Sequence, residues 1–114
     1  MAEIPKELEA QVNEFYSMQT QMQFVMYQKQ QFRLQLDDAE LALGELGKGG
    51  EGEVYKNAGL LMIRTTREDA KKELEEKKEM VGVRLNSLSK QESSLREKMD
   101  ELKKKLEAAT KRKV

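Results

Sequence analysis

The sequence predicts a mainly α-helical protein, a long antiparallel two-helix coiled coil with one short β-hairpin at its joined end. Charged residues make up 37% of the 114 residues and aromatic residues only 5%, whereas typical soluble proteins are about 25% charged. Apolar residues recur at coiled-coil spacing along two long stretches, and glycines separate these stretches. Because large apolar groups are scarce, narrow apolar seams must hold the helices together. We expect residues 1–114 to form a single domain.

The first helix is predicted over residues 5–46. Pro5 suits the first turn of a helix, because its missing N–H is not needed there. From Leu8 to Leu46 the a and d positions of a heptad repeat continue without a slip, which is typical of a coiled coil. These positions, called the seam below, are Leu8, Gln11, Phe15, Met18, Met22, Val25, Lys29, Phe32, Leu36, Ala39, Leu43 and Leu46.

A glycine-rich linker is predicted over residues 47–52 and a β-hairpin over residues 53–66. The linker matches G-x-G-x-x-G, but a dinucleotide site needs that motif between a strand and a helix. Here the motif follows a helix and precedes the hairpin, which favours a flexible linker. The hairpin is expected to turn at residues 57–59, with Gly59 supplying the positive φ.

The second helix is predicted over residues 67–111, and either Thr65 or Thr66 could cap its start. Its seam runs antiparallel to the first, so Leu46 is expected near Leu74, and Leu8 near Leu106. The polar seam residues are expected to snorkel or to pair across the coiled coil and fix its register. The seam positions are Lys71, Leu74, Lys78, Val81, Leu85, Leu88, Glu92, Leu95, Met99, Leu102, Leu106 and Ala109.

The second strand of the hairpin predicts assembly with other chains. Leu60 to Ile63 are four consecutive apolar residues, so both faces of the strand need burial. A lone two-stranded hairpin cannot bury both of its faces and is barely stable. We therefore expect an oligomeric β-sheet hub from which the helices project. The candidate assembly residues are Val54, Tyr55, Leu60, Leu61, Met62 and Ile63.

The composition argues against several classes of function. The chain has no histidine and no cysteine, which removes the commonest general base and the commonest metal ligands. We predict no enzyme activity, no cofactor and no metal site. The balance of 21 basic and 21 acidic residues argues against a nucleic-acid partner. No apolar run approaches the ~20 residues of a membrane span, so we expect a cytoplasmic protein with no membrane partner.

The free end of the coiled coil is a candidate binding site for other proteins. Helix ends fray, and a two-helix tip cannot hide its seam from every side. Exposed apolar groups there would bind apolar surfaces, and methionine adapts to varied partners. Met22 and Leu95 are expected to serve ordinary seam contacts instead. The candidates are Ile4, Leu8, Val12, Phe15, Met18, Met99, Leu102, Leu106 and Ala109.

These features together resemble the prefoldin β family, and the resemblance covers nearly the whole chain. Residues 54–56 followed by residues 59–63 are similar to the hairpin of that family, and residues 83–92 to its second helix. The glutamine-rich first helix, with Gln28-Lys29-Gln30, looks like the archaeal members. Residues 47–66 have room for one hairpin, whereas α-type subunits carry two.

The resemblance implies a subunit of an ATP-independent holdase chaperone. It implies a hexamer with two α-type and four β-type subunits, a hub of twin β-barrels, and non-native client proteins bound at the tips. It also implies transfer of clients to a group II chaperonin. Basic residues near the tip would then be possible docking groups for the chaperonin: Lys103, Lys104, Lys105, Lys111, Arg112 and Lys113.

Two other interpretations remain open from the sequence. A coiled-coil adaptor would close its seam at the tip and bind one fixed partner. An RNA-gripping helical hairpin would bind RNA with strong salt dependence, which the balanced charge disfavours.

Overall fold

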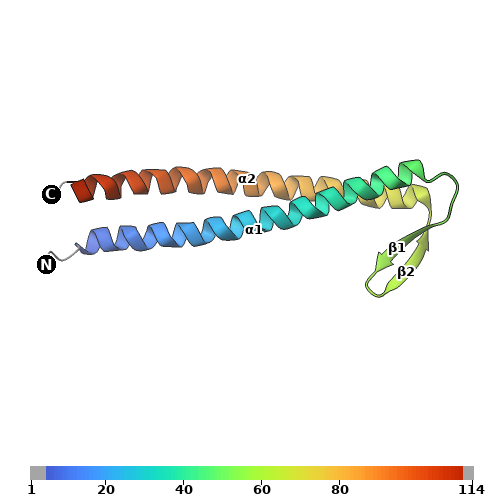
Figure 1. Ribbon diagram of the computed structural model, residues 1–114, viewed down its shortest axis with the longest axis horizontal. Coiled ribbons are helices and arrows are strands. Elements are labelled where there is room, and N and C mark those ends of the chain that lie inside the picture. Colours follow the sequence, from blue (N-terminus) through green and yellow to red (C-terminus); the bar gives the residue numbers. More distant parts are fainter. Residues whose placement is uncertain (1–4, 112–114) are drawn as a thin grey trace. The chain divides into compact units, whose positions relative to one another are not determined.

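The computed structural model describes residues 5–111 and contains two long helices and one hairpin (Figure 1). Along the chain these are α1 (Lys6–Lys48), β1 (Val54–Ala58), β2 (Leu61–Thr65) and α2 (Arg67–Lys111). The predicted fold class of two long helices around one antiparallel hairpin is confirmed.

The chain divides into two compact parts. The terminal part consists of residues 1–29 and 87–114, of which 5–29 and 87–111 are described. The hairpin part consists of residues 30–86. Each part contains a segment of α1 beside an antiparallel segment of α2, and the hairpin part also contains β1 and β2.

All seam positions of α1 are protected from solvent to some degree. Every a and d residue from Leu8 to Leu46 is buried or half-buried. Val25 is the most buried of them in the terminal part, and Ala39 in the hairpin part. A stripe that repeats every 3.5 residues is what two packed helices require. The heptad pattern therefore identified the contact face of α1 correctly.

The seam of α2 follows the heptad except near the start of the helix. Lys71 and Lys78 were expected at a positions, but both side chains are exposed. Ala70 is buried in place of Lys71, because a small apolar side chain can be enclosed where an ammonium group cannot. The Nζ atom of Lys78 lies 3.6 Å from Oε1 of Glu40 on α1, which is the pairing across the coiled coil that we expected.

The end of α1 is held by the first residue of α2. Helix α1 continues to Lys48, two residues beyond the predicted end. The guanidinium of Arg67 donates a hydrogen bond to the carbonyl of Leu46, so a cation satisfies an otherwise free carbonyl at a helix C-terminus. A Cβ atom at Gly49 would lie 3.3 Å from this guanidinium, and Gly50 turns the chain with a φ of 59°.

The hairpin is an antiparallel pair with a tighter turn than predicted. Ala58 pairs with Leu61, so the turn contains only Gly59 and Leu60, and the expected three-residue turn is wrong. Gly59 has a φ of 64°, as expected for a glycine at the first position of a two-residue turn. This shorter turn suits the right-handed twist of paired strands, so residues 57 and 58 remain in β1.

Thr66 caps the start of α2. Its hydroxyl accepts a hydrogen bond from the backbone N–H of Asp69 at 3.0 Å. The carbonyl of Thr66 accepts the first helical bond, from the N–H of Ala70 at 2.9 Å. Of the two threonines that could have capped the helix, the structure selects Thr66, directly after the last residue of β2.

Candidate functional site

The hairpin presents an apolar surface that nothing in residues 5–111 covers. Leu61 is 67% exposed and Met62 is 69% exposed, although both lie within β2. Leu60, Ile63 and Tyr55 are also exposed. Among the candidate assembly residues, only Val54 is half-buried. Because exposed contiguous apolar surface usually marks a contact site, the hairpin is a candidate surface for other chains.

The outer strand edges of the hairpin are also open. Among the described residues, β1 pairs only with β2, so each strand keeps one row of main-chain N–H and C=O groups without strand partners. Such an edge can accept a strand from another chain. Apolar faces and open edges together make the hairpin suited to strand addition.

Polar side-chain contacts hold the two strands together and connect the hairpin to α2. The carboxylate of Glu53 accepts hydrogen bonds from the Tyr55 hydroxyl and the Arg64 guanidinium. The hydrogen bond to Glu53 raises the pKa of Tyr55 above its ordinary value, because it stabilises the protonated phenol. The Nζ atom of Lys56 donates to Oε1 of Glu73 on α2 at 2.9 Å. Charged pairs thus tie the residue before β1 to β2, and β1 itself to α2.

A groove of about 680 Å³ lies between the hairpin and the helices of the hairpin part. Leu46 and Leu74 both line it, as the expected antiparallel register requires. Tyr55, Ala42 and Ala70 add further apolar surface. The helices α1 and α2 therefore cover the side of the hairpin that faces them only partly.

The candidate tip residues lie in the terminal part and form an incompletely closed seam. Leu102 is 7% exposed, so within this part it contributes to the enclosed seam. Ile4 lies outside the described residues. The remaining candidates are half-buried, and they are Leu8, Val12, Phe15, Met18, Met99, Leu106 and Ala109.

Two shallow grooves flank the seam at this end. One, of about 460 Å³, is lined by Phe15 and Leu106 together with Lys103 and Lys111. The other, of about 390 Å³, contains Leu8, with Ala109 beside it. Apolar seam atoms are thus accessible from the sides of the two-helix tip. Leu8 lines this groove with Ala109, whereas Leu106 lines the other groove with Phe15, so neither groove contains the expected pair of Leu8 and Leu106.

Lysines line both grooves, each together with one glutamate: Lys103 and Lys111 with Glu107 in one groove, and Lys105 with Glu7 in the other. Lys103, Lys104, Lys105 and Lys111 are exposed. Arg112 and Lys113, the other candidate docking residues, lie outside the described residues. An apolar groove with exposed lysines at its rim offers both hydrophobic contact and attraction for carboxylates.

A polar layer interrupts the apolar seam of the terminal part. The Nζ atom of Lys29 on α1 lies 2.7 Å from Oε2 of Glu92 on α2. The Arg96 guanidinium lies 2.9 Å from the other oxygen of Glu92. Hydrogen bonds from Lys29 and, after it, Arg96 hold the pKa of Glu92 below its ordinary value. The polar seam residues pair across the helices here, as the sequence predicted.

Helix α1 also carries exposed aromatic residues that were not among the predicted site residues. Tyr16, Phe24 and Tyr27 lie off the seam and are each between 60% and 62% exposed. In the hairpin part, Leu34 and Leu41 are exposed on the same helix. The seven-residue spacing of Tyr27, Leu34 and Leu41 is a signal that could have revealed a second apolar stripe.

Neither a metal-binding cluster nor a membrane-spanning helix is found among the described residues. Between residues 5 and 111, no group of three or more acidic side chains is arranged to hold a metal ion. No helix within that range is long and apolar enough to cross a membrane.

Comparisons with known proteins identify the family. A family model described as a prefoldin subunit matches residues 9–113. The prefoldin β subunit of Pyrococcus furiosus is 41% identical over 96% of this chain and 94% of its own length. The chain belongs to the prefoldin β-subunit family. The prefoldin β subunit of Thermococcus onnurineus is 42% identical over 96% of this chain and 95% of its own length.

A solved structure agrees with this family assignment. The crystal structure of the prefoldin β subunit from Thermococcus strain KS-1 matches with a TM-score of 0.85 and 40% identity, over 96% of each chain. Prefoldin subunits are chaperones rather than enzymes, so this chain is a prefoldin chaperone subunit. It assembles with other prefoldin subunits.

Proposed function

We propose that this chain is the β-type subunit of an ATP-independent holdase. In this proposal it captures non-native proteins at the tips of coiled-coil arms and passes them to a group II chaperonin in the cytoplasm. The complex is a hexamer of two α-type and four β-type subunits. The observation that carries the proposal is the pair of grooves at the tip in which apolar seam residues are accessible, Phe15 with Leu106 in one and Leu8 with Ala109 in the other.

The tip grooves suit a client without a fixed shape. Each groove is shallow and combines half-buried apolar atoms with flexible charged side chains. Met18 and Met99 are half-buried in the same part of the chain, and methionine repacks readily around varied partners. Weak contacts at single tips would add up when one client spans several arms of a hexamer.

The hairpin supports the hub of this assembly. In the proposal, Leu61, Met62 and Ile63 are buried when hairpins of several subunits pair through their open edges into β-barrels. This removes both the exposed apolar faces and the free main-chain groups. Assembly therefore completes a sheet that the chain alone cannot complete.

The lysines at the tip support a role in handover. No nucleotide drives client release in this proposal, so a partner must take the client over. Lys103 and Lys111 line the same groove as Phe15 and Leu106. Carboxylates of a chaperonin that pair with these lysines would lie beside the client-binding atoms, which would favour displacement of the client.

The test is suppression of aggregation of a chemically denatured protein, followed by light scattering. The double substitution Phe15→Ser with Leu106→Ser should raise the concentration of complex needed for half-suppression by at least about fivefold, because apolar contact area is lost. The matched control is Leu34→Ser with Leu41→Ser, which changes exposed apolar residues of the hairpin part. The control should suppress aggregation as well as the unsubstituted chain does.

Two results would contradict the tip proposal. One is equal suppression by the tip variant and the control. The other is full suppression after removal of residues 1–14 and 100–114. A single stoichiometric partner in pull-downs, with no effect on unrelated denatured proteins, would favour a coiled-coil adaptor instead.

A further inference from the structure

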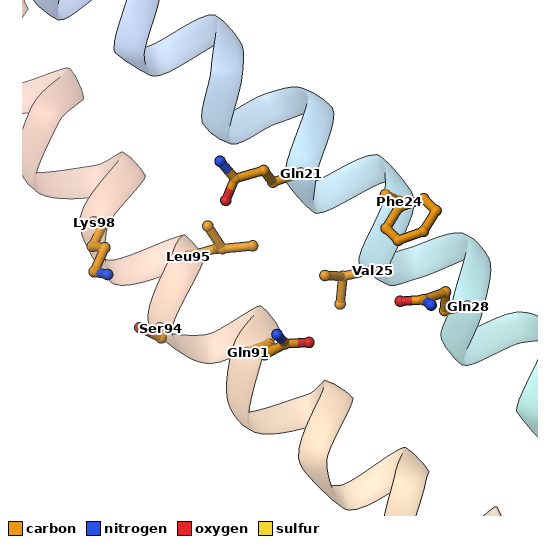
Figure 2. Close-up of a pocket in the computed structure, with 8 residues that line it drawn as sticks. All are labelled: Gln21, Phe24, Val25, Gln28, Gln91, Ser94, Leu95 and Lys98. Carbon is orange, nitrogen blue, oxygen red and sulfur yellow. The ribbon is translucent and has the colours of Figure 1, made fainter.

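A third groove in the terminal part is lined by other residues than the two tip grooves (Figure 2). Its volume is about 360 Å³. On α1 it is lined by Gln21, Phe24, Val25 and Gln28. These residues have the spacing i, i+3, i+4 and i+7, which places them on one face of a helix. The groove therefore follows α1 for about two turns.

Helix α2 lines the groove with the same spacing. Its residues are Gln91, Ser94, Leu95 and Lys98. In Figure 2 the Gln91 side chain reaches from α2 toward α1, and Leu95 does the same. The groove is thus a strip in which amide groups from both helices lie beside a narrow apolar floor.

The amides of this groove are available for binding. The side-chain hydrogen bonds formed among residues 5–111 involve none of Gln21, Gln28 and Gln91. Figure 2 shows Gln21 and Gln28 extending from α1 toward α2, on either side of Val25. Each glutamine amide carries both a donor and an acceptor, the same pair of functions that a peptide group carries. Such amides can pair with any main chain, whatever its sequence.

The groove is also nearly free of charge. Residues 15–28 contain no acidic or basic residue, although 37% of the whole chain is charged. Lys98 is the only charged residue among those that line the groove. A charged segment placed here would lose water without gaining partners for most of its charges, which is unfavourable. The groove therefore matches an uncharged occupant.

The dimensions of the groove favour an extended segment. Seven residues of helix span about 10 Å, which equals three to four residues of extended chain at about 3.3 Å each. A helix from another copy would satisfy its own main-chain groups internally and leave the glutamines unused. An extended segment instead offers free N–H and C=O groups to the amides and apolar side chains to Phe24 and Leu95.

We infer that this groove binds an uncharged, extended segment of a non-native protein through its main chain. The inference rests on the proposed holdase function and adds a second contact, distinct from the tip, that does not depend on client sequence. Client binding then has two components: apolar contact at the tip grooves, and main-chain hydrogen bonding at the flank of the same two helices.

The test uses a labelled eight-residue peptide of serine, asparagine, valine and leucine with blocked ends, and fluorescence anisotropy. The peptide is added to the assembled full-length protein. The groove variant Gln21→Ala, Gln28→Ala, Gln91→Ala should bind the peptide at least about fivefold more weakly, since one net hydrogen bond is worth about that factor. Alanine keeps these helical positions helical, so the variant should remain folded.

The matched control replaces three glutamines of α1 that do not line the groove, with Gln19→Ala, Gln23→Ala and Gln30→Ala. It should bind the peptide like the unsubstituted protein. A second version of the peptide carries N-methyl groups on alternate main-chain nitrogens. The N-methylated peptide should bind the unsubstituted protein weakly. Its affinity should be about that of the original peptide for the groove variant.

Several outcomes would overturn the inference. Equal binding by the groove variant and the control would remove the role of the amides. Undiminished binding of the N-methylated peptide would show side-chain contact without main-chain recognition. If the groove variant changed the oligomer mass and left peptide binding unaltered, the groove would belong to a contact between copies.

A parallel aggregation assay separates this inference from the holdase proposal. If the unsubstituted protein suppresses aggregation but does not bind the peptide, the groove inference fails and the holdase proposal stands. If it binds the peptide through the glutamines but suppresses no aggregation, the groove is supported and the holdase proposal fails.

Discussion

Three charged residues in the terminal part show how polar side chains can specify a coiled coil. Lys29 and Glu92 occupy facing seam positions, and Arg96 completes the layer. Polar seam groups are unfavourable when unpaired, so a register that separates them is penalised. Apolar seam residues accept several registers, because hydrophobic contact has no direction. The polar layer therefore favours the one alignment in which α1 and α2 bring these groups together.

The same residues predict a pH dependence. Because the pKa of Glu92 is lowered in the folded chain, its ion pairs stabilise the protein above its ordinary pKa of 4.5. This contribution should be lost as pH falls through the lowered value. Glu92→Gln should therefore reduce the Tm at neutral pH, and the difference from the unsubstituted chain should shrink in acid. Thermal unfolding followed by circular dichroism measures both effects.

Glu97→Gln is the control for this prediction. Glu97 is also on α2, but it is exposed and makes no ion pair within residues 5–111. Its Tm should match that of the unsubstituted chain at both pH values. A Glu92→Gln variant with an unchanged Tm at neutral pH would show that the layer does not stabilise the alignment.

At the scale of elements, glycines have opposite roles in the turn and in the helix. Gly59 adopts a φ of 64° in the hairpin turn, where other residues are strained. Gly44 lies inside α1, and a Cβ atom there would meet nothing within 4 Å. The turn requires glycine, whereas the helix tolerates it at a cost in conformational entropy.

This contrast gives a paired prediction. Gly59→Ala should lower the free energy of hairpin opening by about 1–2 kcal/mol, because an L-residue resists a left-handed φ. Gly44→Ala should instead stabilise its helix by about 1 kcal/mol. Amide hydrogen exchange across β1, β2 and α1 measures both. The same sign of change in the two variants would contradict the assignment of the turn to Gly59.

At the scale of the whole molecule, the hairpin is the element that the chain leaves unfinished. Both helices find their contacts within the chain, since their seam residues are largely protected. The hairpin has exposed apolar residues on β2 and open edges among the described residues. Two strands alone are marginally stable in water. Association with other subunits is therefore expected to stabilise the hairpin far more than the helices.

Disrupting this surface should separate assembly from helix formation. Leu61→Asp with Ile63→Asp places charges where proposed partner strands would bury apolar groups, so the complex should dissociate into monomers. Most of the helical signal should remain, because the seam does not involve these residues. Light scattering measures the mass and circular dichroism the helicity. Leu34→Asp, an exposed change on α1, is the control.

A mass that stays at that of the complex would contradict the hub. Loss of helix together with mass would show that the helices depend on the hairpin for folding. We expect monomers that retain their helices, because the seam and the hairpin make separate contacts.

The sequence by itself determined the two helices and the contact face of α1, and it predicted a need for partner strands. Heptad spacing specifies which residues of α1 are protected, because helical periodicity is a local property. Four apolar residues in a row, Leu60 in the turn and Leu61 to Ile63 in β2, predicted burial on both sides, because a strand alternates its faces. The residues that resembled the prefoldin β family led to a family assignment that the comparisons confirmed.

Only the tertiary structure decided which positions are enclosed where elements meet. In the structure Ala70, and not the predicted Lys71, is buried in the seam of α2. The turn of the hairpin contains only Gly59 and Leu60 instead of the predicted three residues. The tertiary structure also brought glutamines from α1 and α2 into one groove. These features depend on the rotation and separation of paired elements, which residues far apart in sequence set together. Local periodicity specifies the face of a helix, but only its packed partner determines which atoms on that face remain accessible.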